Sequence, residues 1–120
     1  MQNNHSLLLE NFSYWENKKQ YLELMERFIN GKIDGTQFDS EFCQMWRVDR
    51  DKNYSWKEFL DKIHDVEVTK LEGFSALISD LFTDCDVFQP NPALRDDYEI
   101  SEEELRNCVK KTLLQIQEYF

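Results

Sequence analysis

Glycine and proline are scarce in this chain, which has three glycines and two prolines among 120 residues. Tight turns draw heavily on these two residues, and a small sheet-rich domain needs many tight turns. Their scarcity therefore favours long helices joined by few loops. Hydrophobic residues make up 41% of the sequence, which is too apolar for a disordered chain, and the length fits a single domain over residues 1–120.

Apolar residues recur at helical spacing in the first half of the chain. Residues 16–30 form one apolar stripe that ends at Asn30-Gly31, a pair that tolerates left-handed backbone and predicts a helix stop. A second stripe predicts a helix that begins at Thr36, the expected N-cap, and ends near Arg47. We expect residues 1–15 to form a loosely held N-terminal arm or a short helix.

The second half contains two capping-box patterns, in which a serine is followed three residues later by a glutamate. Ser55 predicts a short helix from Trp56 to about His64. Helix is then expected to resume through Phe82, although residues 65–72 also alternate as a strand does. Ser101 opens the last helix. The sequence therefore predicts an all-α protein, an antiparallel helical bundle of four main helices over residues 16–120, with room for an extra short helix.

The three cysteines, Cys43, Cys85 and Cys108, are too few and too widely spaced to form a disulfide framework. They suit a reducing compartment. The chain begins without the pattern of a secretory signal, and its longest apolar run is three residues, where a membrane span needs about 20. We therefore expect a cytoplasmic protein with no membrane partner.

The net charge of −10 is concentrated in one segment. Residues 80–104 contain nine acids and one base, Arg95, for a net charge of −8, whereas the rest contains fifteen acids and thirteen bases, for −2. This balance repels nucleic acid and anionic membranes, and it attracts a basic protein. Crowding like charges destabilises a fold, which favours a binding role for the segment over the alternative of a merely solvated surface.

The expected partner-binding residues come from this acidic segment. An aromatic side chain beside an acidic patch is a typical interface anchor, so one tyrosine is included, and Trp56 is a second aromatic near a polar loop. The predicted set is Asp80, Asp84, Asp86, Asp96, Asp97, Tyr98, Glu99, Glu102 and Glu103.

Patterns for metal binding and catalysis are incomplete. Tyr54 and Leu60 occupy the positions where an EF-hand loop needs glycine and glutamate, after a match at its first three ligands, Asp49, Asp51 and Asn53. Neither histidine pairs with a cysteine at metal-ligand spacing. A small metal-dependent hydrolase built on the aspartates of residues 80–86 is the remaining catalytic alternative. We expect no enzyme, no metal and no cofactor.

Three motifs follow one another in the C-terminal half. Residues 81–88 contain the pattern LF-x-D-x-D, residues 92–95 end a D-P-x-L-R loop in which Asn91 replaces the acid, and residues 100–105 fit I-x-E-E-E-L. Together with the opening helix, link and second helix, they resemble colicin D immunity-like proteins over about residues 20–118.

The resemblance implies a small helical bundle that acts as an immunity protein, an inhibitor held in the cytoplasm of a toxin-producing cell. It also implies a basic toxin nuclease as the partner. In that family the toxin cleaves transfer RNA, and the immunity protein covers its active site with acidic groups in place of RNA phosphates. Direct nucleic-acid binding is not expected. A non-catalytic acidic scaffold protein is the alternative function, and the sequence leaves monomer and dimer open.

Overall fold

The computed structural model describes residues 4–52, 54–63 and 66–120, with side chains from Leu7 onward. Over this part the chain is all-helical and forms no strand, apart from an isolated bridge between Phe88 and Ile100. A C-terminal 3₁₀ turn, η1, covers Gln117–Tyr119. Six α-helices precede it: α1 (Asn4–Glu16), α2 (Lys18–Ile29), α3 (Gly35–Arg50), α4 (Trp56–Lys62), α5 (Val68–Asp86) and α6 (Glu102–Ile116).

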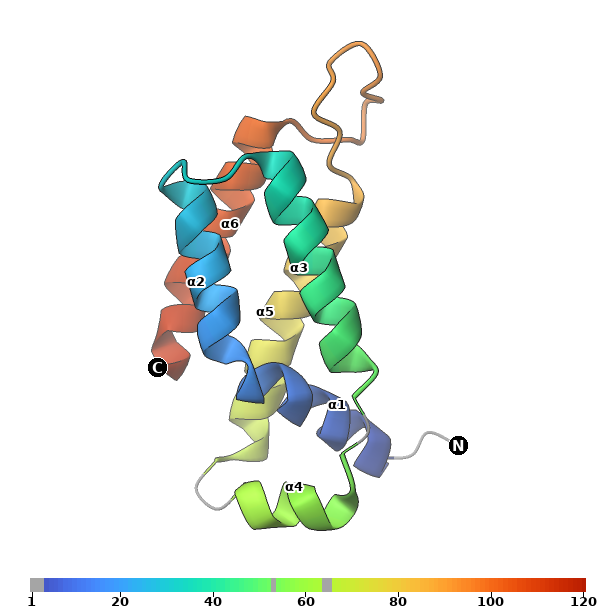
Figure 1. The fold of residues 1–120 in the computed structure, drawn as a ribbon, viewed down its shortest axis with the longest axis vertical. Helices are drawn as coiled ribbons and strands as arrows, with labels where there is room; N and C mark the ends of the chain where they lie inside the picture. The colour runs from blue at the N-terminus through green and yellow to red at the C-terminus, as the bar shows by residue number, and fades with distance from the viewer. Residues whose placement is uncertain (1–3, 53, 64–65) are drawn as a thin grey trace.

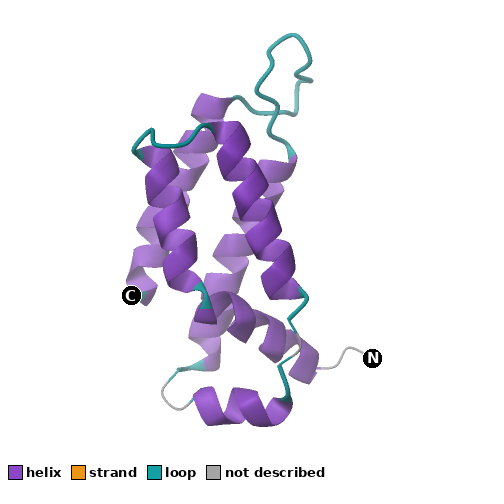
Figure 2. Ribbon diagram, in the orientation of Figure 1, coloured by secondary structure: helices purple, strands orange, loops and turns teal. Residues whose placement is uncertain are grey.

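The helices form a long body closed at one end (Figure 1). Helices α2, α3, α5 and α6 run along the long axis, and α1 and α4 lie across the lower end. The loop between α5 and α6 projects beyond the helices at the opposite end, as its teal trace shows in Figure 2. Helix α1 packs on α3 and α5, while α2 packs on α3 and α6. The chain therefore has two unlike ends, one covered by helices and one carrying a loop.

Side-chain caps determine where three helices begin. The hydroxyls of Ser55 and Ser101 each accept a hydrogen bond from the backbone N–H three residues on, at 3.1 Å, which confirms both predicted caps. The predicted cap at Thr36 is wrong. The Asp34 carboxylate lies two residues earlier and accepts from the Gln37 N–H at 2.8 Å, so α3 begins at Gly35.

The helices agree with the prediction in two places, and a third predicted boundary falls on a residue outside the described part of the chain. Helix α2 ends at Ile29 and Gly31 adopts a φ of +75°, as the Asn30-Gly31 pair predicted. Residues 68–86 form one helix, so the helical alternative for this stretch is confirmed from Val68 onward. Helix α4 ends at Lys62, and His64, the predicted end, lies outside the described residues.

The N-terminal segment forms helix α1 and is part of the core, so the short-helix alternative is confirmed and the loosely held arm is wrong. In α1, Phe12 is 2% exposed and its ring meets the Phe59 ring edge-on at 5.3 Å. Tyr14, on the same helix, is also buried. The buried face of α1 includes two polar residues, Asn11 and Ser13, which interrupt the apolar stripe. That interruption explains why periodicity alone did not decide between a helix and a loosely held arm.

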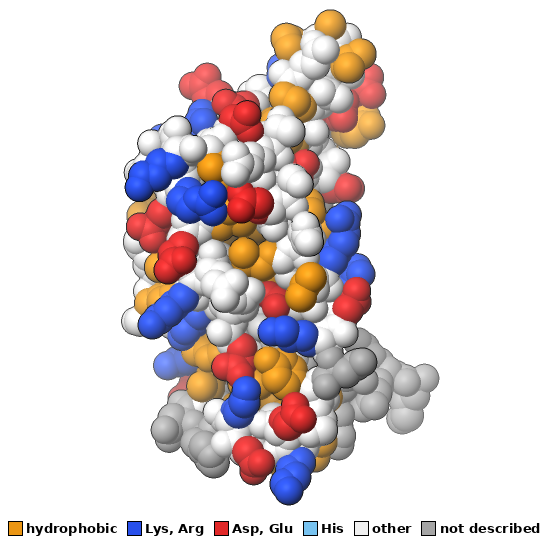
Figure 3. Space-filling model, viewed as in Figure 1, with side chains coloured by type: hydrophobic (Ala, Val, Ile, Leu, Met, Phe, Trp, Pro, Cys, Tyr) orange, Lys and Arg blue, Asp and Glu red, His pale blue; other side chains and the backbone are white. Residues whose placement is uncertain are grey.

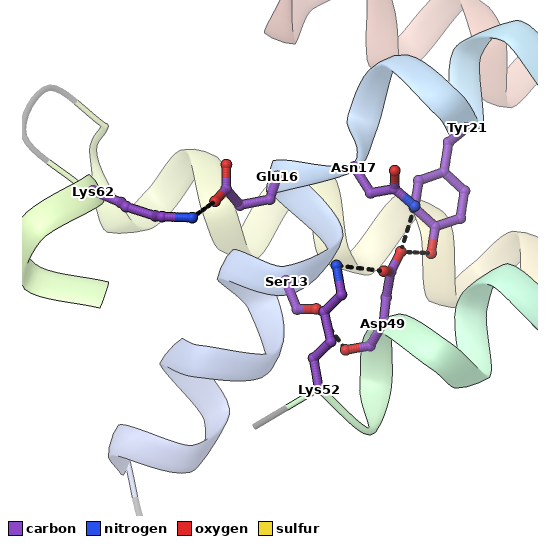
Figure 4. A network of polar contacts seen from close by, with 7 residues as sticks. All are labelled: Ser13, Glu16, Asn17, Tyr21, Asp49, Lys52 and Lys62. Carbon is purple, nitrogen blue, oxygen red and sulfur yellow. Dashed lines mark hydrogen bonds and ion pairs between the residues drawn. The ribbon is translucent and has the colours of Figure 1, made fainter. Parts of the chain in front are cut away.

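Asp49, a buried residue of α3, is hydrogen-bonded to both α1 and α2 (Figure 4). Asp49 is 1% exposed, and its carboxylate accepts hydrogen bonds from the Asn17 amide at 2.9 Å and the Tyr21 hydroxyl at 2.7 Å. Its backbone carbonyl accepts from the Ser13 hydroxyl at 2.6 Å, and the Lys52 ammonium lies 3.8 Å from the other carboxylate oxygen. Asp49 is therefore a structural tie in the core.

The incomplete EF-hand pattern has no ligand geometry in its described part. Asp49 is buried and bonded within the fold, whereas Asp51 is exposed and pairs with the neighbouring Arg50 at 2.9 Å. Asn53, the third position of the pattern, lies outside the described residues. The two described carboxylates have separate partners and do not converge on one point.

Candidate partner-binding surface

Residues 87–101 form a projecting loop, called the finger below. Its two ends are joined by backbone hydrogen bonds: the Ile100 N–H donates to the Val87 carbonyl at 2.8 Å, and the Gln89 N–H donates to the Ile100 carbonyl at 2.9 Å. Gly35 allows α3 to approach this base, because a methyl group there would lie 2.8 Å from both the Phe88 ring and a Glu102 carboxylate oxygen. The base of the finger is thus bound to the helical body.

Hydrogen bonds within the finger give it a defined shape. The Arg95 guanidinium donates to the carbonyls of Gln89 at 2.9 Å and Pro90 at 3.3 Å. The Asn91 side chain accepts from the Ala93 N–H at 3.0 Å. Arg95 is the only base of the acidic segment, and its charged group is turned inward against the loop backbone.

The predicted acids divide by exposure and partners. Those on the exposed surface are Asp80, Asp86, Asp96, Asp97 and Glu103. Two others bond within the fold: Glu99 accepts from the Asp96 N–H at 2.9 Å, and Glu102 accepts from the Gly35 N–H and pairs with Arg106 at 3.5 Å. Tyr98, the predicted anchor, is 70% exposed.

The acids of α5 face two different sides of the helix. Asp80 and Asp84 border a hollow shared with Cys108 and Lys111 of α6. Asp86 borders a groove on the α3 side, because two residues turn an α-helix by about 200°. Burial, and then the nearby charge of Asp80, raise the pKa of the Asp84 carboxyl. The structure therefore places Asp80 and Asp84 together, and sets Asp86 apart from them.

A protein-family model described as bacterial self-protective colicin-like immunity matches residues 18–116. The match spans α2 to the end of α6, which is most of the chain, and leaves α1 outside it. The chain belongs to this immunity family. Searches of curated proteins and of solved structures each found no match.

Two residues on the surface of this immunity-family chain, Asp39 and Leu94, were not among the predicted partner-binding residues. Asp39 of α3 borders the same groove as Asp86, and burial raises the pKa of its carboxyl. Helical spacing places Asp39 and Cys43 on one flank of α3, but the sequence does not tell which helix lies opposite. Leu94 is 65% exposed in the finger, and its only sequence signal is an apolar residue in an irregular, proline-containing stretch.

Trp56, the second aromatic near a polar loop, is packed against the fold. Its ring stacks on the Phe59 ring at a centroid distance of 5.1 Å, in the cluster that covers the lower end. Tyr98 is thus the better candidate for contact with a partner.

Two cysteines of this immunity-family chain, Cys85 and Cys108, lie in surroundings that disfavour the thiolate. A hydrogen bond with Cys43 and burial both raise the pKa of the Cys85 thiol, and burial raises that of Cys108. A thiol with a raised pKa stays protonated at neutral pH and is a poor nucleophile. Within residues 4–52, 54–63 and 66–120, no group of three or more His, Cys, Asp or Glu residues is arranged to hold a metal ion.

Hydropathy identifies no membrane-spanning helix in the part of the chain that the structure describes. Each of its helices is too short or too polar to cross a bilayer.

Proposed function

We propose that this chain is an immunity protein that inhibits a colicin-like toxin by binding a basic surface of the toxin's active domain. The observation that carries the proposal is the acidic finger end of a member of the colicin-like immunity family. Asp86, Asp96 and Asp97 are exposed there, and the segment from residue 80 to residue 104 has a net charge of −8. In this proposal the protein acts by occupying the toxin and has no catalytic activity.

The proposed target is a nuclease that cleaves transfer RNA. The motifs of residues 81–105 resemble those of colicin D immunity-like proteins, whose toxins have this activity. Exposed carboxylates would take the positions of RNA phosphates against lysine and arginine side chains of the toxin, and so exclude the substrate. Because the toxin would act on RNA inside the cell, we propose that the immunity protein works in the cytoplasm.

Opposite charge should act mainly on the rate of encounter. Complementary charged surfaces can raise association rate constants to about 10⁸–10⁹ M⁻¹s⁻¹ at low salt, and salt screens this effect. Glu99 and Glu102 are expected to contribute less to encounter, because each already bonds within the fold. The exposed acids are therefore the ones to test.

The first experiment asks whether the chain protects cells. The chain is expressed in a toxin-sensitive strain. These cells are exposed to the colicin-like toxin released by the strain in which the chain naturally occurs, and their survival is measured. Protection supports the immunity function, and killing at the same toxin dose as in control cells contradicts it. Toxin RNA-cleavage products, measured with and without the chain, test the nuclease assignment separately.

The second experiment tests the acidic surface with two triple variants of equal charge change. In one, Asp86, Asp96 and Asp97 become lysine. In the other, three exposed acids outside residues 80–104 become lysine: Glu23, Asp61 and Glu72. At low salt we expect the first variant to associate with the purified toxic domain at least about 10-fold more slowly, while the second changes little. Equal rates in both would contradict phosphate mimicry and favour the scaffold alternative for these acids.

A further inference from the structure

Two large apolar side chains lie exposed on the finger. Leu94 is 65% exposed and Tyr98 is 70% exposed, and the neighbouring Pro90 and Pro92 are also exposed. Figure 3 shows hydrophobic side chains gathered on this projection, with acidic side chains beside them. Single exposed apolar residues are ordinary on protein surfaces, but a cluster on the most projecting part of a molecule is typical of a contact site.

The finger is shaped before any partner arrives. Its base is joined by the bonds between Ile100 and residues 87 and 89, and the Arg95 guanidinium holds the carbonyls of Gln89 and Pro90. Binding a loop that is already ordered avoids much of the entropy cost of ordering it in the complex. A convex, pre-shaped projection suits insertion into a concave site.

The charge around the exposed apolar residues limits what they can contact. Asp96 and Asp97 lie between Leu94 and Tyr98 in the chain, and both are exposed. A second copy of this chain would bring like charges together, since each copy has a net charge of −10. A basic partner with an apolar hollow would instead match both the charge and the apolar surface.

We propose that Leu94 and Tyr98 are the anchor residues of the complex, and that they enter an apolar pocket enclosed by the basic surface of the toxin domain. This inference rests on the proposed function and assigns a separate task to the finger. The exposed acids set the association rate, and the two apolar side chains set the lifetime of the complex. Buried anchors of this kind act mainly through dissociation, whereas surface charges act mainly through association.

The test measures association and dissociation of the purified toxic domain of the toxin against which the chain protects cells. Leu94→Ala and Tyr98→Ala are each expected to speed dissociation at least 10-fold, with the association rate and its salt dependence unchanged. Leu114→Ala is the matched control, because Leu114 is a leucine of α6 that is 69% exposed. Tyr98→Phe keeps the ring and is expected to keep the complex lifetime. Thermal melting confirms that each variant folds.

Each outcome decides a separate point. If the wild type binds the toxic domain and both alanine variants dissociate at the wild-type rate, the anchor role is wrong and the proposed function stands. If the wild type neither protects cells nor binds, both the proposed function and the anchors fail. Sedimentation of the protein alone gives the remaining check: a dimer that Leu94→Ala or Tyr98→Ala dissolves would assign the finger to self-association and overturn the inference.

Discussion

The lower end of the molecule and the finger end use acidic residues in opposite ways. At the lower end Asp49 is buried, and its carboxylate accepts hydrogen bonds from Asn17 and Tyr21. At the finger end Asp96 and Asp97 face solvent. A buried carboxylate must be bonded because its desolvation is costly, whereas an exposed one keeps its charge available to a partner. Aspartate therefore stabilises the fold at the lower end and gives the surface its negative charge at the finger end.

The family match covers the finger and most of the helical body. It spans residues 18–116, which include the finger, Asp49 and α4, and leaves only α1 of the six helices outside it. We infer that stability and recognition depend on separate residues in this chain. Variants of buried lower-end residues are expected to change unfolding and leave toxin binding intact. Variants of exposed finger-end residues that bond to nothing in the fold are expected to do the reverse.

The largest expected effect is at the lower end, in α1. Phe12→Ala removes a ring that packs on Phe59 and on the buried Leu71. We expect the free energy of unfolding to fall by about 4 kcal/mol, the usual cost of emptying a buried phenylalanine site. Urea denaturation measures it. Leu7→Ala on the same helix is the control, since Leu7 is 42% exposed. A loss from Phe12→Ala as small as that from Leu7→Ala would mean that α1 does not close the core.

The second prediction concerns the buried carboxylate. Asp49→Ala leaves the Asn17 amide and the Tyr21 hydroxyl without their acceptor, and we expect a loss of about 3 kcal/mol in unfolding free energy. Asp51→Ala, two residues on and exposed, is expected to leave the unfolding free energy nearly unchanged. Equal stability of the two variants would contradict the assignment of Asp49 as a structural tie.

The third prediction compares two neighbouring glutamates at the start of α6. Glu102→Ala removes the acceptor of the Gly35 N–H and the partner of Arg106, so we expect a loss of about 1 kcal/mol in unfolding free energy. Glu103→Ala, which is exposed, is expected to leave stability unchanged and to weaken the salt dependence of toxin binding. A loss of stability in Glu103→Ala but not in Glu102→Ala would contradict this assignment.

The smallest expected effect is a pH dependence at Asp84. Burial raises the pKa of its carboxyl in the folded protein above the ordinary value of 3.8, so the folded state keeps the proton to higher pH than the unfolded state does. This residue's contribution to stability therefore falls as pH rises between those two pKa values. Asp84→Asn removes the titration, and we expect its melting temperature to exceed that of the wild type more at pH 7 than at pH 4.

Asp61→Asn, at an exposed position, is the control for this comparison. The contribution of Glu104 to stability has the opposite pH dependence. Hydrogen bonds with Ser101 lower the pKa of the Glu104 carboxyl, so its stabilisation is lost as pH falls through this lowered pKa. The difference between Asp84→Asn and the wild type is therefore taken at each pH. A difference that does not vary with pH would contradict the prediction.

Local signals predicted the parts of the fold that depend on neighbouring residues. The Ser101 capping box and the stop at Gly31 each involve residues within one helical turn, and both were predicted correctly. Contacts between distant residues were not predictable in this way. Asp49 binds residues 28 to 36 positions away, and Glu102 binds Gly35 from 67 positions away. The density of acids near the finger was visible in the sequence, but their division among solvent, caps and helix sides was not.

The paired backbone bonds at the base of the finger have a consequence for engineering. Because Val87, Gln89 and Ile100 close the loop, and Phe88 packs against the core, the segment between residues 90 and 99 begins and ends at nearly one place on the body. Such a segment can be replaced by one of another length or sequence without altering the helices that carry it. Transplanting residues 90–99 between relatives would then be a way to exchange toxin specificity while keeping the scaffold.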